Sequence, residues 1–211
     1  MDLLLYKIMT ERRSKIRLAV LASGGGSNLQ AILDACKTPQ LARAEVAVVV
    51  SNKPEASALE RARKAGVEAL PMDPHDFSDR MVFYGKLAQE LKTRKVDLIL
   101  LAGYMLKLEP NIIKIFKERI LNIHPALLPK FGGHGMYGHF VHEAVMKAGE
   151  KESGATVHVV DEEFDHGPVL LQRKVPVLPG DTAHALAERV LALEHKLYPE
   201  AVAAYIRKIF G

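Results

Sequence analysis

The sequence predicts an α/β fold with a doubly wound, Rossmann-like and mostly parallel sheet, followed by a strand pair and a long C-terminal helix. Strand-like and helical segments alternate five times in the first part of the chain, a pattern typical of sheets covered by helices on both faces. The strand-like segments are near-continuous apolar runs, as expected for strands buried on both faces. In addition, 48% of the 211 residues are hydrophobic, which suits one compact core.

The first half of the chain supplies the alternating elements. The expected strands are residues 17–22, 45–51, 67–72, 96–101 and 119–123, which are short apolar or β-branched runs. The expected helices are residues 29–36, 56–65 and 110–116, and a further helix runs from an N-cap at Ser78 to about Arg94. Loops that directly follow strands matter most, because such sheets bind ligands beyond the carboxyl ends of their strands.

The second half changes character. Residues 140–148 are expected to be helical, and residues 155–160 and 169–177 form the strand pair, with Gly167 and Pro168 turning between them. Residues 183–210 form the long helix, bent near Pro199. We expect residues 1–15 to be an N-terminal extension and residues 16–211 to be a single domain with two halves, 16–116 and 117–211.

Composition argues against several classes of protein. The net charge is +4, and no block of Lys and Arg is interleaved with aromatics, so we expect no nucleic-acid partner. No apolar run approaches the roughly 18 residues that span a bilayer, so we expect no membrane association. The single cysteine, Cys36, excludes an intrachain disulfide and favours a reducing, cytoplasmic setting.

A glycine-rich loop follows the first expected strand. Residues 23–28 read Ser-Gly-Gly-Gly-Ser-Asn and lead into a helix. Backbone N–H groups at such a turn bind phosphate, and the helix dipole favours the anion. The loop has neither the lysine of a P-loop nor the third glycine of a dinucleotide-binding fingerprint. We therefore expect a mononucleotide-type phosphate, with Ser27 and Asn28 as side-chain donors; a plain tight turn is the alternative.

Asn122 and His124 lie two residues apart at the end of the fifth expected strand, so their side chains point to the same side. An imidazolium and an amide that face one point can stabilise a developing oxyanion. Pro125 stiffens the exit from the strand. The alternative interpretation is that His124 is a hydrogen-bonded core histidine.

Four carboxylates occur within five residues in the second half: Asp161, Glu162, Glu163 and Asp165. Most are expected to be solvated. A carboxylate that folds back onto His124 would raise the pKa of the imidazole and orient the ring, but spacing alone does not say which acid does so.

A metal site is not expected. His139 and His142 have the i, i+3 spacing that can present two ligands from a helix. However, the chain has no H-E-x-x-H motif, and Cys36 is remote from these histidines.

Taken together, the motifs resemble the glycinamide ribonucleotide formyltransferases of purine synthesis. The resemblance extends from Ile16 to about Phe210. The matching segments are 23–28, 51–53, 101–105, 122–129, 154–158, 165–168, 180–182 and 194–195.

The resemblance implies a reaction and a set of residues. The formyl group of the co-substrate 10-formyltetrahydrofolate would pass directly to the amine of 5-phosphoribosylglycinamide, without a metal or a covalent enzyme intermediate. Residues 16–116 would form the phosphate-binding half of the formyltransferase domain, and residues 117–211 the catalytic and folate-binding half. The catalytic residues would be Asn122, His124 and Asp165. The phosphate would be held by Gly26, Ser27 and Asn28, and the rest of this substrate by Gly103, Pro125 and Glu194. The folate pocket would comprise Arg80, Met105, Leu106, Lys107, Leu108, Asn122, Asp161, Glu162, Glu163, Phe164 and Asp165.

The chain departs from the family pattern in three places. Residues 132–139 form a longer, more glycine-rich loop than many members have. His166 replaces a glycine that is common after the catalytic aspartate and adds a charge near the folate. Ala126 stands where serine is usual.

Two alternatives stay open. Related folate enzymes act on initiator transfer RNA or hydrolyse formyl-folate, but they carry an added C-terminal β-domain or N-terminal regulatory domain that we do not expect here. The other alternative is a non-catalytic nucleotide- or folate-binding protein, which would not need Asn122, His124 and an acid together. Either a monomer or a homodimer fits the sequence.

Overall fold

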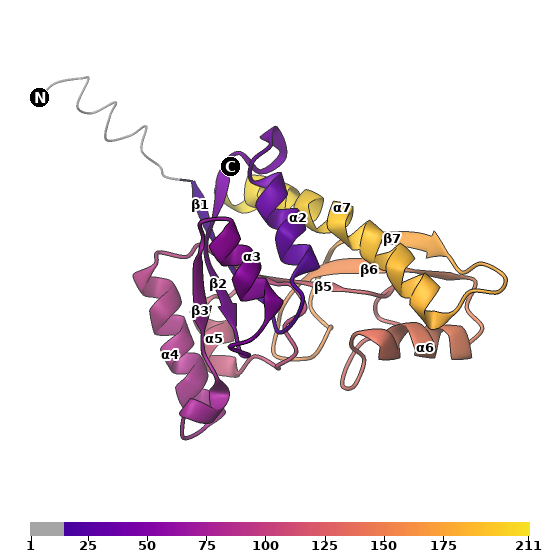
Figure 1. Cartoon of the computed structure of the whole chain (residues 1–211), viewed down its shortest axis with the longest axis horizontal. Helices are drawn as coiled ribbons and strands as arrows, with labels where there is room; N and C mark the ends of the chain where they lie inside the picture. The colour runs from indigo at the N-terminus through magenta and orange to yellow at the C-terminus, as the bar shows by residue number, and fades with distance from the viewer. Residues whose placement is uncertain (1–14) are drawn as a thin grey trace, which may run out of the picture.

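The computed structural model describes residues 15–211 as a central sheet with helices on both faces (Figure 1). Within these residues seven strands form one sheet in the order β3-β2-β1-β4-β5-β6-β7. The strands are β1 (Ile16–Leu21), β2 (Ala44–Ser51), β3 (Glu68–Pro71), β4 (Leu98–Leu101), β5 (Ile120–His124), β6 (Glu152–Val159) and β7 (Val169–Pro176). The expected N-terminal extension, residues 1–15, lies outside the described residues except for Lys15.

The pairing of the strands confirms the predicted doubly wound sheet with an added strand pair. Strands β1 to β5 pair in parallel, whereas β6 and β7 join antiparallel. The strand order reverses between β1 and β4, which is the switch point where such sheets bind ligands. Ser23, directly after β1, bridges this point. Its N–H donates to the Gly103 carbonyl at 3.0 Å, and its hydroxyl accepts from the Met105 N–H at 2.9 Å.

Helices cover both faces of the sheet. They are α2 (Ser27–Ala35), α3 (Ser57–Lys64), α4 (Arg80–Thr93), α5 (Pro110–Ile115), α6 (His139–Lys147) and α7 (Ala183–Phe210), with short 3₁₀ turns η1 (Pro39–Leu41) and η2 (Pro74–Asp76). Leu18 and Val20 of β1 pack in the core with α2, α3 and α7, whereas Ala19 and Leu21 pack with α4 and α5. This alternation explains the continuous apolar runs, because successive strand residues enter two different cores.

Most element boundaries differ from the sequence prediction by one or two residues, and two of the differences have a clear physical cause. The N-cap of α4 is Asp79 and not Ser78, because the Asp79 carboxylate accepts the Val82 N–H at 2.9 Å. Ser78 only donates its hydroxyl to that carboxylate at 3.2 Å. Strand β6 begins at Glu152, three residues early, because its first residues pair with the end of β7.

Two tyrosines of α7 fix this helix to the sheet. The fully buried Tyr198 hydroxyl lies 3.0 Å from the Leu101 carbonyl of β4 and 3.1 Å from the Leu121 carbonyl of β5. The Tyr205 hydroxyl donates to the Glu118 carbonyl at 2.7 Å, just before β5 begins. The helix continues through Pro199 without interruption. None of the helices in residues 15–211 has the length and apolarity that crossing a membrane would require.

Tyr198→Phe removes a hydroxyl that two buried carbonyls share. We expect the free energy of unfolding in urea to fall by about 1–3 kcal/mol, because water does not replace the lost donor at this depth. Tyr205→Phe is the matched control, since its hydroxyl is only partly buried. A loss from Tyr205→Phe that equals or exceeds the loss from Tyr198→Phe would contradict this account.

Candidate active site

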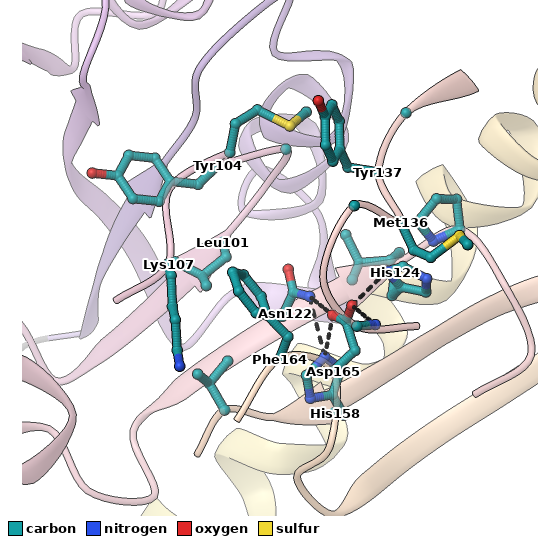
Figure 2. A pocket seen from close by; sticks show the side chains of 18 of the residues that line it. Leu101, Tyr104, Lys107, Asn122, His124, Met136, Tyr137, His158, Phe164 and Asp165 are labelled. Carbon is teal, nitrogen blue, oxygen red and sulfur yellow. Dashed lines mark hydrogen bonds and ion pairs between the residues drawn. The ribbon is translucent and has the colours of Figure 1, made fainter. Parts of the chain in front are cut away.

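The carboxyl end of β5 opens into a cavity of about 660 Å³. Asn122 and His124 line it from the same side of the strand, as their spacing predicts, and Figure 2 shows both beside Asp165 and His158. The cavity also reaches the switch point between β1 and β4, because Asn28 and Gly103 line it. The strand end that carries Asn122 and His124 therefore meets the loops at Asn28 and Gly103 in one place.

Asp165 is the acid that folds back onto β5. One carboxylate oxygen accepts the Asn122 amide at 3.3 Å. The other accepts the Gly133 N–H at 3.0 Å and lies 3.4 Å from Nδ1 of His124. The backbone of Asp165 is left-handed, with φ of 52°, a conformation that aspartate tolerates better than most residues. Asp161, by contrast, binds His166 at 2.9 Å on the outer side of the loop.

His158 is a member of this network that sequence reasoning missed. Its Nδ1 donates to the Val159 carbonyl at 3.1 Å, so its Nε2 accepts from the Asn122 amide, also at 3.1 Å. The residue lies opposite Asn122 in the antiparallel pairing of β5 with β6. The signal was the histidine in segment 154–158, but only the strand register reveals its partner.

The amide of Asn122 is oriented by its two neighbours. Its nitrogen donates to Asp165 and to His158, and Figure 2 shows its oxygen on the side away from both. These donor–acceptor distances, 3.3 and 3.1 Å, are at or beyond the long end of the usual range for N–H donors. The bonds are therefore weak enough for a stronger acceptor, such as an oxyanion, to compete for them.

Burial and charge oppose each other at His124. Burial lowers the pKa of this histidine, since only 4% of its surface is exposed, and the nearby Asp165 carboxylate acts in the raising direction. The net shift is downward, so the expected rise in pKa is not found. For Asp165, burial raises the pKa, but the neighbouring His158 and His124 and the hydrogen bond from the Gly133 N–H lower it, and the net shift is downward. The resting pair at neutral pH is therefore a neutral imidazole beside an ionised carboxylate.

The other end of the cavity is formed by Asn28 and Glu194. The Asn28 amide donates to the Glu194 carboxylate at 2.7 Å, and both residues are buried. Burial raises the pKa of Glu194 to about 7, although the Asn28 hydrogen bond opposes the shift. Gly26 caps α2 in the left-handed conformation, with φ of 72°, and a Cβ there would lie 2.9 Å from Ala58. Only glycine therefore lets the loop start α2 at this point.

The remaining expected site residues fall into two groups. Gly103, Pro125, Met105, Leu106, Lys107, Leu108, Asp161, Glu163 and Phe164 line the cavity. Gly26, Ser27, Arg80 and Glu162 do not line it. Arg80 instead binds Glu109 at 2.6 Å and the Lys107 carbonyl, so it holds the backbone of the loop that follows β4.

The loop of residues 132–139, together with the start of α6, supplies a wall of the cavity that the sequence did not assign. The residues of this wall are Gly133, His134, Gly135, Met136, Tyr137, Gly138, His139 and His142. His134 meets the Phe164 ring edge-on, with the centroids 6.1 Å apart, across the mouth. Among residues 15–211, no three His, Cys, Asp or Glu side chains are grouped to hold a metal ion.

Comparison with known proteins agrees with this geometry. The formyl transferase family profile matches residues 16–202. The phosphoribosylglycinamide formyltransferase of Escherichia coli is 42% identical over 184 residues, which cover 87% of this chain and 84% of that protein. The trifunctional purine biosynthetic protein adenosine-3 of Drosophila melanogaster is 43% identical over 201 residues, or 95% of this chain, but this chain spans only 14% of its length.

A solved structure gives the same result. Glycinamide ribonucleotide transformylase 1 from Symbiobacterium toebii superposes with a TM-score of 0.88 and 45% sequence identity, covering 93% of this chain and 90% of that one. The family resemblance seen in the sequence motifs is confirmed. The chain belongs to the formyl transferase family and, within it, to the phosphoribosylglycinamide formyltransferases.

Proposed function

We propose that the protein transfers the formyl group of 10-formyltetrahydrofolate to the glycinamide amine of 5-phosphoribosylglycinamide, giving the formylated product and tetrahydrofolate in de novo purine synthesis. One observation carries the proposal. A single cavity joins the glycine-loop end, with Asn28 and Glu194, to Asn122, His124 and Asp165. A plain nucleotide-binding protein needs the first group alone, whereas acyl transfer to a nucleotide needs both. The related enzymes carry names that describe this reaction.

The two substrates would approach from opposite ends of the cavity. The phosphate would lie at Gly26, Ser27 and Asn28, where the N-terminus of α2 favours an anion. Glu194, Gly103 and Pro125 would then contact the ribose and glycinamide. The folate would occupy the wall made by residues 105–108 and residues 161–165, with Arg80 supporting the first of these segments. Residues 16–116 thus supply mainly the phosphate side, and residues 117–211 the catalytic and folate side.

The chemistry needs a proton acceptor first and a proton donor second. As the amine attacks, a C–N bond forms, the formyl oxygen becomes an oxyanion, and the amine nitrogen must lose a proton. The neutral His124 beside ionised Asp165 is in the right state to take it. Collapse of the adduct then breaks the bond to the folate nitrogen, which receives the proton from the same pair. At the end of the reaction the amine nitrogen has lost one proton, the folate nitrogen has gained one, and the imidazole is neutral again.

The oxyanion would be stabilised by two groups. His124 becomes an imidazolium only after it takes the proton, so its charge develops together with that of the oxyanion. The Asn122 amide, held by its weak bonds to Asp165 and His158, would donate to the oxyanion in their place. Neither step requires a metal or a covalent bond to the enzyme.

The setting would be cytoplasmic, and the partners would be small molecules rather than nucleic acid or membrane. Burial raises the pKa of the free Cys36 thiol to about 11, which keeps it protonated and unreactive. We propose that the active unit is a monomer or a homodimer.

The direct test is a formyl-transfer assay with 10-formyltetrahydrofolate and 5-phosphoribosylglycinamide, run beside a reaction that lacks the acceptor. We expect turnover only with the acceptor present. Equal consumption of formyl-folate without the acceptor would identify a hydrolase. Binding of both ligands without turnover would identify a non-catalytic binding protein.

His124→Ala and Asp165→Asn remove the two halves of the proton-transfer pair. We expect kcat to fall by about 100- to 1,000-fold or more, while KM for phosphoribosylglycinamide changes little. Because Asp165 acts to raise the pKa of His124, the acid limb of the pH profile should move to lower pH in Asp165→Asn. The exposed His75→Ala and Asp34→Asn are controls that should keep wild-type kinetics. Near-normal turnover in either active-site variant would refute the role assignment.

Glu194→Gln tests the acceptor side. The pKa of Glu194 is raised to about 7, so the carboxylate that would accept the ribose hydroxyls forms only as the pH rises through that value. We expect KM for phosphoribosylglycinamide to fall between pH 6 and pH 8 in the native enzyme and to stay flat in the variant.

The same substitution has an effect on stability that needs no substrate. The folded state holds the Glu194 proton more tightly than the unfolded chain, so this residue lowers stability as pH rises from its ordinary value of 4.5 to about 7. Compared with the native protein, Glu194→Gln should therefore gain up to about 3 kcal/mol in free energy of unfolding between pH 4.5 and pH 8. Glu188→Gln, exposed on the same helix, should show no such gain.

A further inference from the structure

A backbone carbonyl binds the catalytic histidine from behind. Nε2 of His124 lies 2.7 Å from the carbonyl oxygen of Phe131, seven residues later in the chain. The carbonyl has no proton to give, so the ring nitrogen must be the donor. The contact is well within hydrogen-bond range, and the ring is almost fully buried, so water does not compete for the bond.

Phe131 adopts an unusual backbone conformation to make this contact. Its φ is 55°, in the left-handed region that non-glycine residues rarely enter. The surroundings enforce it. The phenylalanine ring packs against the core and lines a second, smaller cavity with Leu127 and Val145. A Cβ on the next residue, Gly132, would lie 2.5 Å from Leu128 and 3.1 Å from Asp165. Strained backbone that its surroundings hold in place is common at functional sites.

This contact restricts where His124 can gain or lose a proton. If Nε2 always carries a hydrogen, the neutral ring has its free lone pair on Nδ1. That nitrogen lies 3.4 Å from the Asp165 carboxylate. The other titratable groups that influence the His124 ring are His158 and His142. Within residues 15–211, neither of these two histidines forms a hydrogen bond with a ring nitrogen of His124. Nδ1 is thus the one site on the ring that is open to proton exchange.

We propose that Phe131 is a positioning residue whose left-handed carbonyl fixes the Nε2–H tautomer of His124, so that each proton the histidine exchanges passes through Nδ1 on the side of Asp165. The kinetic consequence rests on the proposed formyl transfer, whereas the tautomer does not. The proposal explains why the ring and the carboxylate lie 3.4 Å apart at rest, because the neutral Nδ1 and the carboxylate both present lone pairs.

A matched pair of substitutions separates the backbone from the side chain. Phe131→Gly and Phe131→Val both remove the phenyl ring, but glycine adopts a positive φ freely, whereas a β-branched residue resists it. We expect Phe131→Gly to keep the Nε2–H tautomer and most of kcat. In Phe131→Val, kcat should fall between about 10-fold and about 10⁴-fold, the larger figure being the cost of a wrong histidine tautomer in a serine protease. KM for phosphoribosylglycinamide should be little changed in both.

The decisive measurement is the nitrogen-15 NMR spectrum of the histidine side chains in the unsubstituted protein, with His124 assigned from the signals missing in His124→Ala. Through a pH titration, Nε2 should keep its proton and Nδ1 alone should change. Titration at Nε2, or the same tautomer and kcat in Phe131→Gly and Phe131→Val, would overturn the proposal. If Phe131→Val does not fold, as judged by circular dichroism, the spectrum of the unsubstituted protein decides alone. If the unsubstituted protein keeps Nε2–H throughout the titration but transfers no formyl group, the proposed function is refuted and the fixed tautomer is still supported.

Discussion

The carboxylate of Asp165 is the point on which the candidate site depends. It accepts hydrogen bonds from the Asn122 amide of β5 and from the Gly133 N–H in the loop of residues 132–139. It also lies 3.6 Å from Nε2 of His158 in β6. Strands β5 and β6 are already paired in the sheet, so the segment that the carboxylate adds to them is the loop of residues 132–139. A negative charge that is only partly exposed must be compensated by donors, and the donors here are the groups that chemistry would use. The carboxylate thereby attaches this loop to the strand pair that carries Asn122 and His158.

Burial sets the protonation states at both ends of the cavity. It favours the neutral form of His124 and of Glu194, so a base and an acid are both shifted toward losing their charge. Asp165 keeps its charge because the Asn122 amide and the Gly133 N–H both donate to it. Groups at similar depth thus carry different charges according to their hydrogen bonds, which is how one small cavity can hold an ionised carboxylate beside a neutral imidazole near neutral pH.

Much of the fold could be predicted from the sequence, because helical and strand periodicity is local. The same locality placed Asn122 and His124 on one side of a strand. Asp165 was different: four acids had suitable spacing, and a family resemblance was needed to choose among them. The role of His158 could not be predicted, because its partner is set by the register of β5 against β6, which no local sequence pattern encodes. Phe131 could not be found for a related reason, since its contribution is a backbone carbonyl and a left-handed backbone angle, which a phenylalanine in the sequence does not indicate.

Tyr198 and Glu194 are four residues apart on α7 and so lie on one face of the helix. The hydroxyl of Tyr198 attaches that face to β4 and β5, which means that the position of Glu194 is set by the sheet. Other parts of the cavity wall come from loops, including residues 132–139. A change in the length or sequence of these loops would therefore leave the position of Glu194 unchanged. One side of the cavity is thus held by the sheet through α7, whereas the shape of another side depends on the local sequence of a loop.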